Sequence, residues 1–136
     1  KIFRCDCPVT SALDIVGDKW TLVIIKLMLL EYKKTFKDFS ESAESIAPNI
    51  LSARLKTLLK TGFITKVMHP DNKKTFIYNL TEKGLSLTPV IIELGLWSHN
   101  NIKESDIYIL NELNMNINNK SKLNQQIIDK YKEILL

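Results

Sequence analysis

Residues 47–62 carry polar side chains that could form hydrogen bonds and ion pairs with a negatively charged partner. At 100° per residue, four leucines and Gly62 share one face of a helix, as expected where a helix packs on a core. The opposite face is polar and basic; it comprises Asn49, Ser52, Ala53, Arg54, Lys56, Thr57 and Lys60. The segment contains no Asp or Glu, although Glu–Lys pairs four residues apart stabilise an exposed helix by a few tenths of a kcal/mol. This bias indicates that a requirement other than helix stability shapes the polar face.

The residue types on this face match the groups that line double-stranded DNA. An asparagine amide bonds adenine bidentately, a serine hydroxyl donates or accepts, and an alanine methyl can touch a thymine methyl. We therefore predict base-edge contacts by Asn49, Ser52, Ala53 and Lys56, and phosphate or guanine contacts by Lys56 and Lys60. Arg54 lies at the flank, where a phosphate contact and an internal ion pair are both open. Pro48 suits the first helical position and joins the predicted interface; the alternative for the whole face is an ordinary solvated surface.

The two cysteines are the second group of candidate reactive residues. Cys7 stands just before a predicted helix with Arg4 close in sequence, and both features lower a thiol pKa. Redox or electrophile sensing by Cys7, and less so by Cys5, is one interpretation; an inert small hydrophobe is the other. A Cys5–Cys7 bridge within one chain would be strained at this spacing, whereas a bridge between subunits stays open. With His69 and His99 they lack the spacing of metal ligands, so we expect no metal and no cofactor.

Composition and motifs narrow the function classes. There is no Gly-rich phosphate loop, nucleophile motif or catalytic carboxylate pair, so we do not expect an enzyme. Residues 45–83 hold seven Lys or Arg against two acidic residues, whereas residues 101–136 balance at five each; the positive excess therefore lies mid-chain. The apolar run 22–30 is too short to span a bilayer, and residues 1–8 lack the apolar stretch of a signal peptide. We expect a cytoplasmic protein with no membrane partner.

Helices before this segment must position its polar face. A helix over about residues 9–16 should stop at Gly17, and Asp18 should cap a second helix that is apolar nearly all round and therefore central. A short helix should then turn Phe36 and Phe39 inward. Ala47 offers no capping side chain to the helix that follows, so we expect a DNA phosphate or Ser45 to satisfy its first amides.

After Gly62 the pattern changes to β-rich segments joined by "PDNKK", which predicts a hairpin with a basic tip. We expect Lys73, Lys74 and Thr75 to contact the DNA backbone or minor groove, with a merely solvated tip as the alternative. His69 begins this loop and is interpreted as a wing residue. Thr81 should cap one long helix bent at Pro89, followed by helices at about residues 104–114 and 121–135.

This order predicts a mainly α fold with a small β-hairpin wing. A short helix, a turn and a helix with a basic exposed face have helix-turn-helix geometry, and the hairpin makes it a winged helix. We assign a winged helix-turn-helix domain to residues 1–100. Residues 101–136 form a C-terminal helical extension that we expect to add dimer contacts.

Segments in this order resemble the HxlR-type winged-helix transcription regulators, relatives of the MarR-like regulators. The resemblance covers about residues 5–100 and rests on "CPVTSALDIVGDKWTLVIIKLML", "FKDFSESAESIAPNILSARLKTLLKTGFI", "YNLTEKG" and "LTPVIIELGLW". It implies a dimeric DNA-binding regulator, and some members sense oxidants or electrophiles through an N-terminal thiol. The chain departs from the family at Thr35, where an Arg is usual, at Ala47, where a Ser is usual, and in the wing, "HPDNKKT". Its operator therefore cannot be borrowed from relatives.

The predicted function is a homodimeric regulator that binds a roughly palindromic operator in double-stranded DNA. Two recognition helices would enter successive major grooves, with half-sites ~34 Å apart. The aromatic and apolar side chains expected in the core or dimer interface are Trp20, Phe36, Phe39, Leu87, Val90, Ile91, Leu94 and Trp97. The competing hypothesis is a winged-helix module that binds protein, for which charge reversal at Lys56 and Lys73 would leave function intact.

Overall fold

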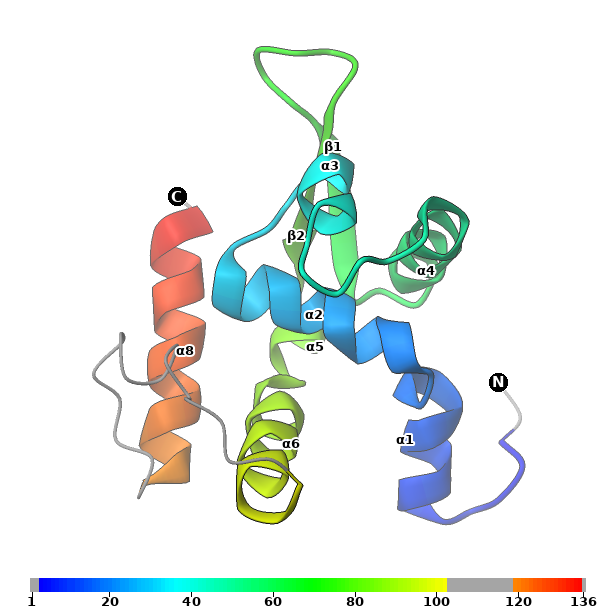
Figure 1. Ribbon diagram of the computed structural model, residues 1–136, viewed down its shortest axis with the longest axis vertical. Helices are drawn as coiled ribbons and strands as arrows, with labels where there is room; N and C mark the ends of the chain where they lie inside the picture. The colour runs from blue at the N-terminus through cyan, green and yellow to red at the C-terminus, as the bar shows by residue number, and fades with distance from the viewer. Residues whose placement is uncertain (1–2, 103–118, 136) are drawn as a thin grey trace.

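The computed structural model describes residues 3–102 and 119–135. It confirms a mostly helical fold with one two-stranded antiparallel hairpin (Figure 1). In chain order the elements are α1 Pro8–Val16, α2 Lys19–Glu31, α3 Phe36–Ser40, α4 Pro48–Lys60, β1 Ile64–Met68, β2 Phe76–Leu80, α5 Glu82–Leu85, α6 Thr88–Asn101 and α8 Lys120–Leu135. No helix in the described ranges is long and apolar enough to cross a membrane.

Helix α2 is the centre of the core, as its nearly continuous apolar sequence predicts. Its buried residues are Thr21, Ile24, Ile25, Leu27, Met28 and Leu29. It packs against α4, α6, α8 and β2. The predicted cap at Asp18 is confirmed, because its carboxylate accepts from the amides of Trp20 and Thr21, both at 3.0 Å. Trp20 itself is partly buried against this core.

The short helix α3 buries one of its two aromatic residues. Thr35 and Asp38 form a capping box at its start, and the Phe39 ring is fully buried, with its centroid 6.2 Å from that of Tyr78. Phe36 is 38% exposed, so the expectation that both rings point inward is wrong for Phe36. A five-residue helix presents a single side to the core, and Phe39 occupies it.

The hairpin follows α4 through a tight turn. Gly62 adopts a φ of 84°, a left-handed conformation that favours glycine, and the chain then enters β1. The register runs from Ile64 opposite Leu80 to Met68 opposite Phe76. In Figure 1 the loop between the strands projects farther from the core than any labelled helix near it.

The prediction of a single bent helix after the hairpin is wrong, because the structure has two helices there. Thr81 caps it as expected by accepting from the Gly84 amide at 3.2 Å, but α5 ends at Leu85 and α6 begins at Thr88. Pro89 lies in the first turn of α6, where a proline does not remove a helical hydrogen bond. The chain therefore breaks into two helices where a bend was expected.

The C-terminal helix α8 confirms the prediction of a helix at residues 121–135, and its apolar side joins the domain core. Leu123, Ile127 and Tyr131 recur every four residues and are buried against α2 and α6. The Tyr131 hydroxyl accepts from the Leu80 amide at 2.8 Å, which ties α8 to the end of β2. The helix predicted at residues 104–114 lies outside the described residues.

Candidate nucleic-acid interface

Helix α4 separates its apolar and polar residues as the sequence predicts. Leu51, Leu55 and Leu58 are buried, which holds the helix on the core. The opposite face is open to solvent; its exposed residues are Pro48, Asn49, Ser52, Ala53, Lys56, Thr57 and Lys60. The predicted recognition set is therefore accessible to a partner, with Arg54 only partly exposed.

The start of α4 leaves its first amides without a side-chain acceptor. Ala47 is the N-cap residue and makes no side-chain cap, and no acidic residue lies in the first turn. Ser45 has a φ of 54° and its amide donates to the Ser42 carbonyl at 3.0 Å. The described structure thus does not show the cap by Ser45 that the sequence left open. Free amides and the positive end of the helix dipole are suited to a phosphate.

The sequence left two roles open for Arg54, a phosphate contact and an internal ion pair, and the structure shows the ion pair. Its Nε donates to Asp18 Oδ1 at 2.8 Å, and both side chains are about one-third exposed. Burial by itself would raise the pKa of the Asp18 carboxyl, but hydrogen bonds from Thr21 and Arg54 outweigh it and hold that pKa below its ordinary value. Asp18 was visible in the sequence as a helix cap, whereas its contact with Arg54 was not.

The wing presents its two lysines to solvent. Lys73 and Lys74 are exposed, and Asn72 orders the loop around them, since its side chain accepts from the Lys74 amide at 3.1 Å and donates to the Thr75 hydroxyl at 3.0 Å. Thr75 is half-buried and its hydroxyl is already used within the loop. His69 accepts from the Asp71 amide at 3.0 Å, which makes it part of the wing loop.

A cleft between α3 and the wing adds residues that the sequence analysis missed. Its volume is about 440 Å³, and it is lined by Thr35, Phe36, Lys37, Ser40, Lys74, Thr75, Phe76 and Tyr78. Lys37 comes from the first helix of the helix-turn-helix pair and Lys74 from the wing, so both positive charges border one opening. The exposed Lys37 in "FKDF", next to a predicted recognition helix, was the signal that could have included it.

The N-terminal thiol has the local setting that the sequence predicts, with one difference. Cys7 is exposed and is the N-cap residue of α1. Hydrogen bonds from the backbone amides of Thr10 and Val9 and from the Thr10 hydroxyl lower the pKa of the Cys7 thiol. Arg4, which was expected to assist, forms an ion pair with Asp14 instead. Both cysteines are free thiols.

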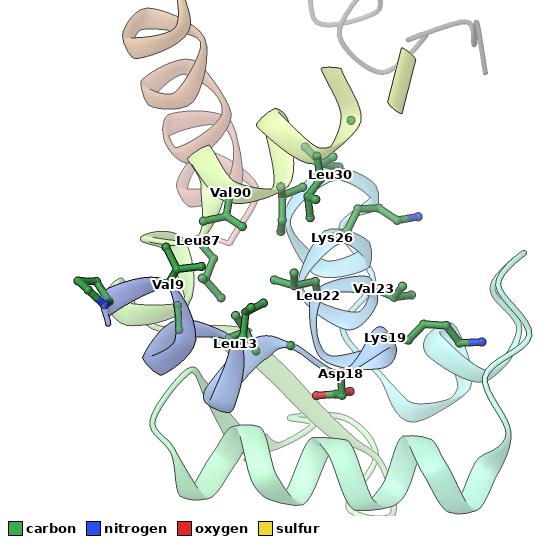
Figure 2. Close-up of a pocket in the computed structure, with 17 residues that line it drawn as sticks. Val9, Leu13, Asp18, Lys19, Leu22, Val23, Lys26, Leu30, Leu87 and Val90 are labelled. Carbon is green, nitrogen blue, oxygen red and sulfur yellow. The ribbon is translucent and has the colours of Figure 1, made fainter. Parts of the chain in front are cut away.

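An apolar groove runs between α1, α2 and α6, on a different side of the domain from the wing (Figures 1 and 2). It has a volume of about 980 Å³, and its walls include Val9, Leu13, Leu22, Val90 and Leu94. Figure 2 shows Val9 and Leu13 of α1 facing Leu87 and Val90 across it.

The residues predicted for the core or dimer interface divide into two groups. Ile91 is buried in the core, and Leu87 and Trp20 are partly buried against it. Val90, Leu94 and Trp97 are 42%, 51% and 57% exposed, at spacings of four and three along α6. The second group forms an apolar face of α6 that no residue in the described ranges covers.

We compared the chain with known protein families. A model of the HxlR-like helix-turn-helix family matches residues 15–106. The chain belongs to this family. The matched range covers the elements from α2 to α6, including the wing, whereas most of α1 and all of α8 lie outside it.

Relatives within the HxlR-like family are HTH-type transcriptional regulators and not enzymes. YybR of Bacillus subtilis is 29% identical over 79% of this chain and 85% of its own length, and YodB of the same organism is 33% identical over 68% and 82%. The structure of reduced YodB superposes with a TM-score of 0.57 at 30% identity, over 75% of this chain and all of YodB. The oxidised redox regulator HypR gives a TM-score of 0.61 at 26% identity, over 74% of this chain and all of HypR.

Proposed function

We propose that this HxlR-like protein is a sequence-specific regulator that binds a roughly palindromic operator in double-stranded DNA. The observation that carries the proposal is the exposed face of α4, which offers Asn49, Ser52, Ala53 and Lys56 without an acidic residue. These groups complement base edges, and acidic side chains there would repel the phosphates. Lys73, Lys74 and Thr75 of the wing, with Lys60 of α4, extend the positive surface to the backbone.

We infer that two copies form the functional unit. The exposed Val90 and Leu94 on α6 and the exposed Val9 and Leu13 on α1 border one apolar groove, and the exposed Trp97 continues the α6 stripe. Monomeric proteins rarely leave such a contiguous apolar surface in water. A two-fold dimer of this kind would bind two half-sites, which requires its two copies of α4 to lie ~34 Å apart. The dimer contacts expected from residues 101–136 stay a prediction.

We further propose that Cys7 responds to an oxidant or electrophile. Its lowered pKa increases the fraction of reactive thiolate, and its side chain is accessible. Among the relatives, YodB is known in a quinone-bound form, and HypR in an oxidised one. A reducing, cytoplasmic setting for the two free thiols belongs to this proposal.

The test is DNA binding by the purified protein across a salt series. A duplex selected from a random pool by the wild-type chain serves as operator, beside the DNA upstream of its own gene. Charge reversal at Lys56 and Lys73 is expected to weaken binding strongly, whereas Lys122→Glu, an exposed site on α8, serves as the charge-matched control. DNA binding that survives both reversals would remove Lys56 and Lys73 from the interface. A wild-type chain that forms no specific, salt-dependent complex would support the protein-interaction module instead.

The role proposed for Cys7 is tested by the same DNA-binding assay with an oxidant or an electrophile added. Diamide or a quinone should change the affinity of the wild-type chain, and a Cys7→Ser chain should not respond. An equal response of both chains would remove Cys7 from the mechanism and leave the DNA-binding proposal standing.

A further inference from the structure

Asp18 lies at the point where α1, α2 and α4 meet. Its carboxylate caps α2 through the amides of Trp20 and Thr21 and accepts from the Thr21 hydroxyl. The same carboxylate accepts from Arg54 Nε at 2.8 Å, 36 residues further along the chain. Figure 2 shows Asp18 at the end of the apolar groove, pointing toward α4. One side chain therefore joins the corner between α1 and α2 to the middle of the recognition helix.

This corner is closely packed on its α1 side. Gly17 ends α1, and a Cβ added there would lie 2.3 Å from the Leu13 carbonyl oxygen. Gly17 and Asp18 both line the groove that α6 completes. Lys19 does not compete for the Asp18 carboxylate, because its ammonium lies 4.6 Å from the centroid of the Trp20 ring.

The contact of Arg54 with Asp18 can fix the rotation of α4 about its own axis. Apolar packing is non-directional, so Leu51, Leu55 and Leu58 fix the rotation of the helix about its axis less strictly than a directional contact does. A charge-assisted hydrogen bond is short and directional and resists such rotation. Arg54 follows Ala53 directly and precedes Lys56 by two positions, so its partner sets where those two side chains point.

We propose that Arg54 is a positioning residue, which through Asp18 holds the base-reading face of α4 in register with the corner between α1 and α2, and that it is not a phosphate contact. The inference rests on the proposed DNA-binding function. It also assigns Asp18 to the recognition machinery, although Asp18 itself does not face the DNA side of α4.

The experiment compares operator affinity and its salt dependence for Arg54→Lys, Arg54→Gln, Asp18→Asn and the Asp18→Asn/Arg54→Gln double variant. Asn caps a helix about as well as Asp, so Asp18→Asn removes the charge and keeps the cap. Glu41→Gln, at an exposed acidic residue next to α3, controls for the general effect of removing a negative charge. The probe is the duplex selected by the wild-type chain.

A positioning role has a distinct signature. Arg54→Lys and Arg54→Gln should lose affinity for the selected duplex about equally, roughly tenfold, with an unchanged slope of log K against log salt. Asp18→Asn should lose affinity relative to Glu41→Gln, because a neutral amide oxygen binds Arg54 less strongly than a carboxylate does. The double variant should bind no worse than the weaker single variant, because both substitutions weaken the same interaction. Lys56→Gln, by contrast, should reduce the slope by about 1.

The opposite pattern overturns the inference. If Arg54→Lys binds like the wild type, Arg54→Gln lowers the slope by about 1, and Asp18→Asn binds more tightly than Glu41→Gln, then Arg54 contacts phosphate. Thermal unfolding of each free variant verifies that the compared chains are folded at the assay temperature. A wild-type chain that forms no specific complex with any selected duplex overturns the proposed function and this inference with it.

Discussion

Asn49 is the exposed residue of α4 with the strongest capacity to select a base. Its amide can donate to and accept from one adenine edge, which a truncated side chain cannot reproduce. Lys56 and Lys60, in comparison, attract any phosphate irrespective of sequence. Specificity and affinity should therefore separate along the same face of the helix.

Substitution of Asn49 tests this separation. Asn49→Ala should cost about 1–3 kcal/mol on the preferred duplex and relax the preference at one base position, with an unchanged salt slope. Competition binding against single-base variants of the duplex measures both effects. An equal loss of affinity for all duplexes would indicate that Asn49 contacts the DNA backbone and not a base.

The thiol of Cys7 gives a pH-dependent prediction. The amides of Thr10 and Val9 and the Thr10 hydroxyl stabilise the thiolate and so lower its pKa. Loss of the hydroxyl in Thr10→Val should therefore raise the pKa and move the pH midpoint of alkylation upward. Iodoacetamide rates across pH, measured in a Cys5→Ser background, report this midpoint. An unchanged midpoint would show that the Thr10 hydroxyl contributes nothing to the thiolate.

At the scale of elements, the exit from α4 determines how the wing is attached. Gly62 is in the left-handed region, and the Thr81 hydroxyl donates to its carbonyl at 2.6 Å. This contact ties the start of the hairpin to the residue that follows its second strand. The recognition helix and the wing thus share one short connection whose geometry depends on a glycine.

Replacement of Gly62 should be costly for a backbone reason alone. A Cβ would meet no atom within 4 Å, so strain in φ is the only penalty. Gly62→Ala should lower the free energy of unfolding by roughly 1–2 kcal/mol, whereas Gly62→Asn should lose less because Asn tolerates this conformation. Urea denaturation compares the two. Equal losses would point to a steric cause elsewhere.

In the molecule as a whole, the apolar side of α8 is buried and the apolar stripe of α6 is exposed. The inner side of α8 is covered by α2 and α6 of the same chain, and ion pairs Lys120–Glu93 at 2.6 Å and Lys132–Glu82 at 2.9 Å flank that contact. The stripe Val90, Leu94 and Trp97 on α6, by contrast, is exposed and is not covered by the part of the chain that the structure describes. Truncation at residue 101 would therefore damage the core as well as any dimer contact, and point substitutions are the sharper test.

A charge placed in the exposed α6 stripe should separate the two copies. Leu94→Glu would bury an unpaired carboxylate in the proposed interface, so we expect the dimer dissociation constant to rise at least about tenfold, or ~1.4 kcal/mol. Sedimentation at several concentrations measures it, with Ser121→Glu on exposed α8 as the control. A Leu94→Glu chain that dimerises like the control would exclude this face.

The sequence alone determined the features that depend on local periodicity and on residue type. The leucine repeat placed α4 and both of its faces, Asp18 and Thr81 marked helix starts, and the β-rich segments with a basic loop predicted the wing. These signals are local, because each depends on neighbours within one or two turns. The resemblance to the HxlR-type regulators joined them into one fold.

Contacts between residues far apart in the chain depend on tertiary packing and could not be predicted from the sequence. The ion pair of Arg54 with Asp18, 36 residues earlier, at 2.8 Å is one such contact. Phe36 and Phe39 are equivalent by spacing, yet only Phe39 faces the core. Likewise, Tyr131 reaches the end of β2 across 51 residues. Such contacts depend on how elements pack in three dimensions, and no local pattern encodes which partner a polar or aromatic side chain will find.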